Sequence, residues 1–276
     1  MSYNSPTDLA TALALAATAH QTVIAGGTDV YPASRQGRAP SHLLDITRIP
    51  DLNAIEQTPE HIRIGAAVSW TKIIKADLPA AFDALKQSAR QVGSVQIQNA
   101  GTIGGNLCNA SPAADGVPPL LTLDASVEIT SQARGPRTVP LGAFITGVRA
   151  TNLQPDELVT AILVPTPDPL AKSAFEKLGS RAFMVISITM TSAQITCDAS
   201  GRITQARVAV GACSAVAQRL PDLEAALIGA LPENAHVTSQ HLTPLSPLDD
   251  VRGSAEFRLD VVAQQCVRTI KQAAMA

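Results

Sequence analysis

The pattern of apolar and polar positions over the first 60 residues predicts one helix and two short strands. Residues 8–19 are mostly alanine and leucine, which favour a helix, and the carboxylate of Asp8 lies at the start, where it interacts favourably with the helix dipole. The apolar runs 21–25 and 41–46 have the length of strands. We therefore expect a small α/β unit over residues 1–57.

A second and larger unit is predicted over residues 58–168. We expect strands at 61–64, 125–130 and 157–165, and helices at 69–74, 80–92 and 120–124. Pro165, Pro167 and Pro169 follow one another so closely that neither a helix nor a central strand can continue through them. We therefore expect a domain boundary at about residue 168.

Residues 169–276 predict a smaller α+β domain. Residues 183–195 are rich in β-branched side chains, 198–201 read DASG, which is typical of a turn, and 203–210 alternate between apolar and polar. This succession indicates an antiparallel hairpin. Apolar residues recur at helical spacing within 255–273, so we expect the domain to end in a helix.

The composition excludes several classes of protein. The net charge is −2, charged residues make up 16% and hydrophobic residues 46% of the 276 positions, which fits neither a disordered chain nor a broad nucleic-acid-binding surface. Aromatic residues are only 3%, too few to stack bases along a single strand. Neither a signal-like segment nor an uninterrupted long apolar stretch is present, so we expect no membrane span and a cytoplasmic protein.

The sequence has no recognised hydrolytic motif, and neither its cysteines nor its histidines have the spacing of a metal site. The four cysteines form no C-x-x-C pair, which argues against an iron–sulfur cluster. His236 and His241 lie in a polar segment without a carboxylate placed as a further ligand, so we expect them to be exposed. Neither a G-x-S-x-G elbow nor an H-E-x-x-H motif occurs.

Two glycine-containing segments are the candidates for ligand binding. The first, AGGTD at 25–29, follows an apolar run, and consecutive N–H groups in such a segment can form a concave site for a phosphate. A tight turn after a strand is the alternative, because neither the G-x-G-x-x-G fingerprint nor the P-loop lysine is present.

The second segment, NAGTIGGN at 99–106, lies in a stretch without charged side chains that extends from 91 to 114. Its glycines permit close approach to a ligand, while Thr102, Asn106 and Asp115 supply side-chain donors and acceptors. A long structured loop is the alternative, although a glycine-rich loop of this length inside a compact domain is more often functional than not.

Five motifs, taken in order and spacing, resemble those of one family. They are AGGTD at 25–29, NAGTIGGNLCNASPAAD at 99–115, ELVTAILVP at 157–165, FEKLGSR at 175–181 and DVRGSAEFR at 250–258. Over essentially its whole length the chain resembles the FAD-binding medium subunit of the molybdenum hydroxylases, the xanthine dehydrogenase and carbon monoxide dehydrogenase relatives. The TIGGN motif with Asp115 downstream is the most specific part of the resemblance.

This resemblance implies an α+β fold with two domains. The first, over residues 1–168, is a two-part FAD-binding domain of the vanillyl-alcohol oxidase or PCMH type, with parts at about 1–57 and 58–168. The second, over residues 169–276, is a smaller α+β carboxy-terminal domain with an antiparallel sheet, similar to that of carbon monoxide dehydrogenase flavoproteins.

The resemblance also implies which residues bind FAD. The backbone of 25–29 is expected to cradle the pyrophosphate, and the second glycine segment to close on it. Asp115 is expected to accept a hydrogen bond from the cofactor, Val159 to pack on it, and Lys177 to place a positive charge near the flavin ring. The complete expected set is Ile24, Ala25, Gly26, Gly27, Thr28, Asp29, Gly101, Thr102, Ile103, Gly104, Gly105, Asn106, Asp115, Val159 and Lys177.

In this family a large subunit with the molybdenum cofactor hydroxylates the substrate, and a small subunit carries two [2Fe–2S] clusters. The resemblance therefore implies that this chain is the FAD-carrying electron-transfer subunit of an oxidoreductase, that it passes electrons to an external acceptor, and that the complex is a dimer of heterotrimers. The cofactor then performs the chemistry, and the protein orients and tunes it. Two other functions stay open: a stand-alone FAD-dependent oxidase or dehydrogenase, and a flavin-less binding or assembly module.

Overall fold

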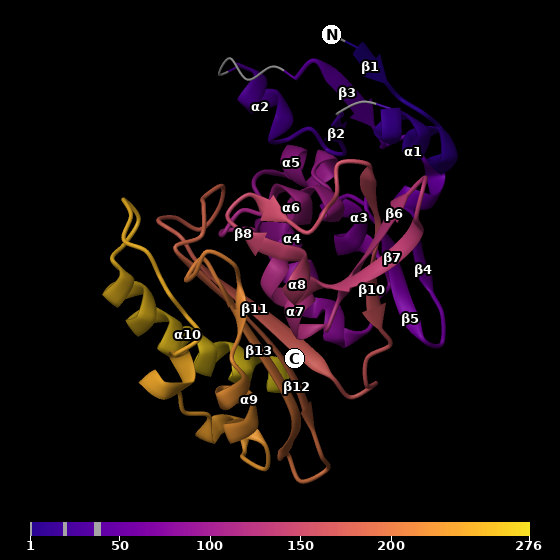
Figure 1. Cartoon of the computed structure of the whole chain (residues 1–276). Coiled ribbons are helices and arrows are strands. Elements are labelled where there is room, and N and C mark those ends of the chain that lie inside the picture. Colours follow the sequence, from indigo (N-terminus) through magenta and orange to yellow (C-terminus); the bar gives the residue numbers. More distant parts are fainter. Residues whose placement is uncertain (1, 19–20, 36–39) are drawn as a thin grey trace. The chain divides into compact units, whose positions relative to one another are not determined.

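The computed structural model describes residues 2–18, 21–35 and 40–276 (Figure 1). The chain forms two compact units. Unit 1 contains residues 1–73, 95–110 and 125–166, and unit 2 contains residues 74–94, 111–124 and 167–276. No helix in the described ranges combines the length and the apolar character needed to cross a bilayer.

Unit 1 begins with a three-stranded parallel sheet. β3 (His42–Asp45) lies in the centre, between β1 (Ser2–Asn4) and β2 (Thr22–Ile24), and both pairings are parallel. The strands predicted within 21–25 and 41–46 are confirmed. α2 (Val30–Arg35) follows β2, so the segment 25–29 lies between the end of a strand and the start of a helix.

α1 (Leu9–Thr18) connects β1 with β2 and confirms the predicted helix. The N–H of Thr11 donates a 2.8 Å hydrogen bond to Oδ1 of Asp8, so this carboxylate satisfies an amide of the first turn. Ala12 and Ala16 bury the inner face of the helix in a core that includes Leu44. Residue 19, the last of the predicted helix, lies outside the described residues.

The larger sheet of unit 1 has five strands with antiparallel neighbours. Their order is β4 (Ile55–Gln57), β5 (His61–Gly65), β10 (Glu157–Pro165), β6 (Ser126–Ser131) and β7 (Gly135–Pro140). β10 is the central strand and almost every one of its side chains is buried, which explains its continuous apolar sequence. The strands predicted at 61–64, 125–130 and 157–165 are confirmed.

Short elements connect these strands. They are η1 (Pro50–Asn53), α3 (Trp70–Lys75), α5 (Val95–Ala100), α6 (Ile103–Asn109), α8 (Leu141–Phe144), β8 (Ile145–Gly147) and β9 (Ala150–Thr151). Most of the second glycine segment forms the end of α5 and the start of α6 rather than a long loop. α6 packs against β10, so the core of the unit holds this segment in place.

Unit 2 contains a four-stranded antiparallel sheet. Its order is β11 (Lys172–Leu178), β12 (Thr189–Cys197), β13 (Ile203–Gly211) and β14 (Gln218–Arg219). The hairpin predicted around the DASG turn is confirmed, and the N–H of Gly201 donates to the carbonyl of Asp198 at its tip (3.0 Å).

The predicted start of the β12 strand at residue 183 is wrong. Residues 183–188 belong to a loop between β11 and β12, and the first residue of the strand is Thr189. Met184 has a φ of +53°, which an extended strand cannot contain. The side chains of Phe183 and Ile186 are exposed, so their strand-favouring character is not used in a sheet.

Helices cover both faces of β12, which contacts α4 (Asp83–Gln91), α7 (Val117–Thr122) and α10 (Ala255–Met275). The other helices of the unit are η2 (Ala80–Phe82), which contacts β11, α9 (Pro221–Leu227), which contacts β13, η3 (Pro232–Asn234) and η4 (Ser239–Leu242). On one face Thr191 hydrogen-bonds Thr269 of α10 (2.7 Å), and on the other Ser192 hydrogen-bonds Thr122 of α7 (3.1 Å). Because β12 is covered on both faces, its sequence is buried throughout and includes paired hydroxyls.

Candidate functional site

The segment 25–29 of unit 1 forms a turn after β2. Gly27 has a φ of +67°, a conformation that glycine adopts at no steric cost. Among the residues that the structure describes, no backbone carbonyl accepts a hydrogen bond from the N–H groups of residues 26–29. Successive N–H groups in a tight turn form a concave site for an anion. The segment therefore has the backbone donors that a phosphate requires.

Gly26 lies directly against the second glycine segment. A Cβ on Gly26 would be 2.1 Å from the carbonyl oxygen of Ala100 and 2.7 Å from the Cα of Gly101. Both contacts are backbone atoms that cannot rotate away, so only glycine fits at this position. The structure thus brings together, within unit 1, the two segments that the sequence predicts to bind one ligand.

The second segment is fixed by its own hydrogen bonds. Thr102 caps α6, because its Oγ1 accepts a 3.0 Å hydrogen bond from the N–H of Gly105. The N–H of Gly104 donates to the carbonyl of Ala66 (3.0 Å), and a Cβ on Gly104 would be 2.6 Å from that oxygen. The hydroxyl of Thr102 and the amide of Gly104 therefore hold the segment rigidly beside Gly26.

Asn106 has a buried acceptor without a donor. Its side-chain Oδ1 is buried, and no residue in the described ranges donates a hydrogen bond to it. Leaving a buried acceptor unpaired costs about 1–3 kcal/mol. A ligand that brings a hydroxyl or amino donor would remove this cost.

Three of the predicted site residues have side chains in the core of unit 1. Ile24, Ile103 and Val159 are at most 5% exposed. Their side chains pack inside the protein, so only their backbone atoms are available to a ligand. The strand pairing of β10 with β6 shifts register next to Val159, which frees the backbone locally from the regular ladder.

Asp115 and Lys177 form a buried ion pair in unit 2. The Nζ of Lys177 lies 2.6 Å from Oδ2 of Asp115, and the two side chains are 5% and 9% exposed, respectively. Burial raises the pKa of the Asp115 carboxyl, while the ammonium of Lys177 and the hydroxyl of Ser187 act in the opposite direction. The structure therefore joins two predicted site residues that are far apart in the sequence.

Ser187 completes this cluster, and the sequence analysis did not identify it. Its hydroxyl donates a 2.5 Å hydrogen bond to Oδ1 of Asp115, so both oxygens of the carboxylate have partners. α4 contributes two further bonds: Ser88 donates to the backbone carbonyl of Asp115 (2.8 Å), and Lys177 donates to the carbonyl of Gln91 (3.3 Å). An isolated serine that interrupts an apolar run was the available signal for Ser187, and it does not indicate a partner.

Comparison with known proteins identifies the family. The model of the FAD binding domain in molybdopterin dehydrogenase matches residues 1–167, and that of the CO dehydrogenase flavoprotein C-terminal domain matches residues 173–273. The chain belongs to this family of FAD-binding subunits. The resemblance seen in the five motifs is thereby confirmed, as is the expected order of an FAD-binding domain followed by a carboxy-terminal domain with an antiparallel sheet.

Several relatives match this chain over almost its full length. The chain is 30% identical to the nicotine 6-hydroxylase medium subunit of Paenarthrobacter nicotinovorans, over 98% of this chain and 96% of the relative. It is 32% identical to the putative xanthine dehydrogenase FAD-binding subunit of Escherichia coli K12, over 100% and 96% of the two chains.

Solved structures show the same fold. A chain of the Cu,Mo-CO dehydrogenase superposes with a TM-score of 0.90 at 25% identity, covering 100% of this chain and 98% of the other. A chain of quinoline 2-oxidoreductase from Pseudomonas putida 86 gives a TM-score of 0.89 at 26% identity, with 100% and 97% covered.

The residues of the two glycine segments fit FAD. FAD has a pyrophosphate, which the amides of residues 26–29 can bind, and ribose, ribityl and adenine groups that carry hydrogen-bond donors. One such donor can pair with the buried Oδ1 of Asn106. The close contact of Gly26 with Ala100 leaves room for backbone only, and not for a side chain, at this position.

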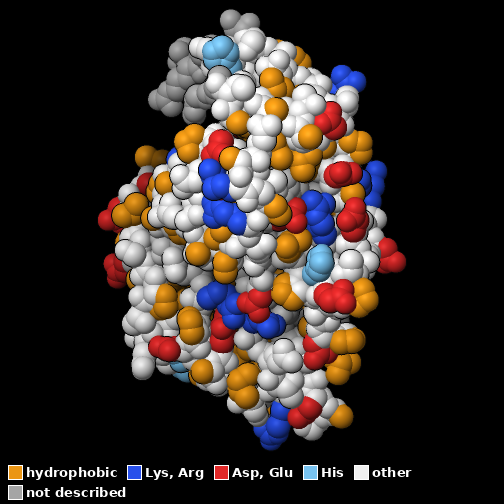
Figure 2. All heavy atoms as spheres, turned by 45° about the vertical axis from the view of Figure 1, so that its right-hand side comes forward, with side chains coloured by type: hydrophobic (Ala, Val, Ile, Leu, Met, Phe, Trp, Pro, Cys, Tyr) orange, Lys and Arg blue, Asp and Glu red, His pale blue; other side chains and the backbone are white. Residues whose placement is uncertain are grey.

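No group of three or more His, Cys, Asp or Glu side chains in the described ranges could hold a metal ion. His236 is exposed as predicted, whereas His241 is partly buried and accepts a hydrogen bond from the N–H of Thr238 through Nδ1 (3.2 Å). On the face drawn in Figure 2, basic and acidic side chains are intermixed.

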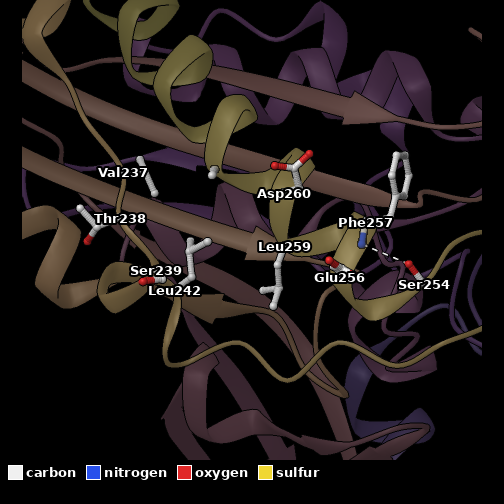
Figure 3. Close-up of a pocket in the computed structure, with 10 residues that line it drawn as sticks. Val237, Thr238, Ser239, Leu242, Ser254, Glu256, Phe257, Leu259 and Asp260 are labelled. Carbon is white, nitrogen blue, oxygen red and sulfur yellow. Dashed lines mark hydrogen bonds between the residues drawn. The ribbon is translucent and has the colours of Figure 1, made fainter.

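A groove in unit 2 lies between η4 and the first turns of α10 (Figure 3). Glu256 and Asp260 bring carboxylates to it, and Leu242 and Leu259 supply apolar surface. Ser254 at its edge caps α10, accepting a hydrogen bond from the N–H of Phe257 (3.1 Å). None of its lining residues belongs to the glycine segments or to the Asp115 cluster.

Proposed function

We propose that the chain binds FAD and serves as the electron-exit subunit of a molybdenum-containing hydroxylase or dehydrogenase. The observation that carries the proposal is the contact of Gly26 with Ala100 and Gly101, which joins two glycine segments into one backbone cradle. When bound, FAD supplies the redox chemistry of the chain, taking electrons from [2Fe–2S] clusters of a partner subunit and passing them to an external acceptor.

The residues of this chain bind and orient the cofactor. We propose that the amides of residues 26–29 bind the pyrophosphate and that Asn106 accepts a hydrogen bond through Oδ1. The other contacts we propose come from the same two segments and from four single residues. They are Ile24, Ala25, Gly101, Thr102, Ile103, Gly104, Gly105, Asp115, Val159 and Lys177.

Lys177 supplies the positive charge in this proposal. A cation beside the flavin ring raises its affinity for electrons by Coulomb attraction, and burial strengthens this effect because the local dielectric is low. Asp115 and Ser187 hold the ammonium at a fixed place within unit 2. No side chain of the chain acts as an acid, base or nucleophile in this function.

The domain organisation is proposed on the same grounds. We propose an FAD-binding domain of the vanillyl-alcohol oxidase or PCMH type over residues 1–168, in two parts at about 1–57 and 58–168, and a carboxy-terminal domain over 169–276. The two family models, which end and begin at 167 and 173, support this division.

The proposed assembly is a dimer of heterotrimers. Its other members are a small iron–sulfur subunit and a large subunit with the molybdenum cofactor. Support comes from relatives named as medium or FAD subunits, among them the carbon monoxide dehydrogenase medium chain of Hydrogenophaga pseudoflava. We propose that the complex works in the cytoplasm, where thiols stay reduced, in keeping with four free cysteines.

The test is a visible absorption spectrum of the chain purified with its natural neighbours, before and after acid release of cofactor. Flavin bands together with iron–sulfur absorption and molybdenum support the proposal. Flavin on an isolated chain that oxidises a substrate by itself favours a stand-alone oxidase instead. A chain that stays without flavin after FAD is added overturns the proposal and leaves the flavin-less module.

A further inference from the structure

Arg258 is a buried cation outside the predicted site. It lies in the first turn of α10 and is only 3% exposed. Its Nη1 donates to the backbone carbonyls of Ile188 (2.5 Å) and Ala212 (2.9 Å), and its Nη2 donates to Oδ1 of Asp250 (2.6 Å). A buried guanidinium with this many partners fixes the segments that it joins, because each bond constrains the same rigid plane.

One of these bonds leads to Asp115 through the neighbouring serine. Ile188 follows Ser187, whose hydroxyl donates to Oδ1 of Asp115. The N–H of Ile188 also donates to the carbonyl of Leu178 (2.8 Å), which closes the base of the 179–188 loop. Arg258 thus holds the end of the loop from which Ser187 reaches the carboxylate.

A second bond leads to Asp115 by a separate path. Ala212 has a φ of +60°, which is strained for a residue with a Cβ. Its carbonyl accepts from Arg258, and its N–H donates to the carbonyl of Pro112 (3.0 Å), three residues before Asp115. Arg258 therefore holds a strained residue that in turn fixes the segment carrying the carboxylate.

We propose that Arg258 is a positioning residue for the Asp115–Lys177 pair. It acts through the backbone of Ile188 and Ala212, and it touches neither member of the pair. This inference rests on the proposed function only in its last step, from the geometry of the pair to the properties of bound FAD.

A lysine cannot replace this guanidinium. Arg258 donates at the same time to a carboxylate and to the carbonyls of Ile188, Ala212 and Gly253, which requires several donors in a fixed plane. Arg258→Lys keeps the positive charge and loses the planar set of N–H donors. Any effect on the Asp115–Lys177 pair then comes from the position of its residues and not from charge. Arg252 offers a matched control, because it also pairs with Asp250 (3.0 Å) but is exposed.

The experiment uses the full chain with FAD added, as wild type, Arg258→Lys, Arg252→Lys, Lys177→Met and the double variant Lys177→Met/Arg258→Lys. The first readout is the proton exchange rate of the Lys177 ammonium, followed by NMR of ¹⁵N-labelled lysine. We expect Arg258→Lys to raise this rate about tenfold, an effect of the size that mutations along a network of coupled residues produce. Arg252→Lys should leave it unchanged.

The second readout is the midpoint potential of bound FAD. We expect Arg258→Lys to move it towards the Lys177→Met value, and the double variant to match Lys177→Met alone. An unchanged ammonium exchange rate in folded Arg258→Lys would overturn the proposal, as would additive shifts in the double variant. If Arg258→Lys does not fold, Asp250→Asn loosens the same guanidinium more gently and is judged by the same criteria.

The two proposals fail differently. If the wild-type chain binds no FAD, the proposed function is wrong, while the exchange rate of Lys177 in the apo-protein still decides the role of Arg258. If FAD binds and Lys177→Met changes its potential but Arg258→Lys changes neither readout, the proposed function stands and Arg258 serves only to stabilise unit 2.

Discussion

The Nζ of Lys177 and the Oδ2 of Asp115 are 2.6 Å apart in a part of unit 2 where both side chains are more than nine-tenths buried. Removing two charges from water costs several kcal/mol per ion, so such a pair stabilises a fold only if its remaining donors and acceptors are also satisfied. Ser187 supplies such a partner to the carboxylate, and the carbonyl of Gln91 supplies one to the ammonium. Well-packed apolar residues in place of Asp115 and Lys177 would stabilise the unit equally well. This favours a functional reason for the two charges.

Removing one member of the pair should destabilise the chain strongly. We expect Lys177→Met to lower the free energy of unfolding by about 3–5 kcal/mol at neutral pH, because it leaves a buried carboxylate without its cation. Burial already raises the pKa of Asp115, so acidification should protonate it and recover part of the loss. Urea denaturation at neutral and acidic pH measures both effects.

Two variants control this experiment. The double variant Lys177→Met/Asp115→Asn removes both charges and should recover most of the stability. Arg268→Gln removes a half-exposed ion pair with Glu176 in the same unit and should cost at most about 1 kcal/mol. Equal losses of unfolding free energy in Lys177→Met and Arg268→Gln would show that the buried pair stabilises the unit no more than an exposed one.

Gly26 should not tolerate a side chain. We expect Gly26→Ala to abolish FAD binding and to destabilise the chain by about 1–3 kcal/mol, because its Cβ would overlap the carbonyl oxygen of Ala100. Gly142→Ala in α8 is the matched control, since a Cβ there meets nothing within 4 Å. Fluorescence titration with FAD and thermal denaturation test the pair. Normal FAD affinity in Gly26→Ala would show that the backbone cradle formed by the two glycine segments does not bind FAD.

Sequence reasoning found the parts of the site that have a local signature. Residues 25–29 and 101–106 stand out in the sequence because they are rich in glycine, and glycines leave the backbone accessible to a ligand. Ser187 has no such signature, and the DVRGSAEFR motif that ends in Arg258 does not reveal what Arg258 contacts. Ser187 bonds the carboxylate of Asp115, and Arg258 bonds Asp250 and two backbone carbonyls. Every residue type has a backbone carbonyl, so such contacts cannot be read from the sequence.

The misplaced strand start has a related cause. Residues 183–188 contain the β-branched Val185 and Ile186, which favour a strand locally. Tertiary contacts decide otherwise: the base of the loop closes between Leu178 and Ile188, and the sheet begins after it. Propensity describes what a residue tolerates, while the pairing partner decides where a strand begins.

Asn106 should show opposite effects on stability and on cofactor binding. We expect Asn106→Leu to leave the apo-protein as stable as wild type or more so, by up to about 1–3 kcal/mol, because the variant removes a buried acceptor to which no described residue donates. The same change should weaken FAD binding about tenfold, the equivalent of one lost hydrogen bond. Denaturation without FAD and titration with FAD measure the two effects. Loss of stability without loss of affinity would assign Asn106 to the core.

Glu157 should make unit 1 sensitive to acid. Its carboxylate accepts two hydrogen bonds from Arg137, Nε to Oε1 (2.8 Å) and Nη2 to Oε2 (2.6 Å). These bonds, with further ones from the N–H of Gln154 and from Arg134, lower its pKa from 4.5 to about 2. A carboxyl with a lowered pKa stabilises the fold above its unfolded value, and this contribution is lost as the pH falls from about 4.5 towards 2.

We therefore expect Glu157→Gln to be less stable than wild type by up to about 2 kcal/mol at neutral pH, a value reduced from the full shift because solvent screens the partly exposed Arg137. The difference should close as the pH approaches 2, since wild-type Glu157 is then protonated. Glu56→Gln, at an exposed position of β4, is the control. Urea denaturation between pH 7 and pH 2 follows the gap, and a constant difference over this range would mean that the ion pair contributes nothing and the loss comes from packing alone.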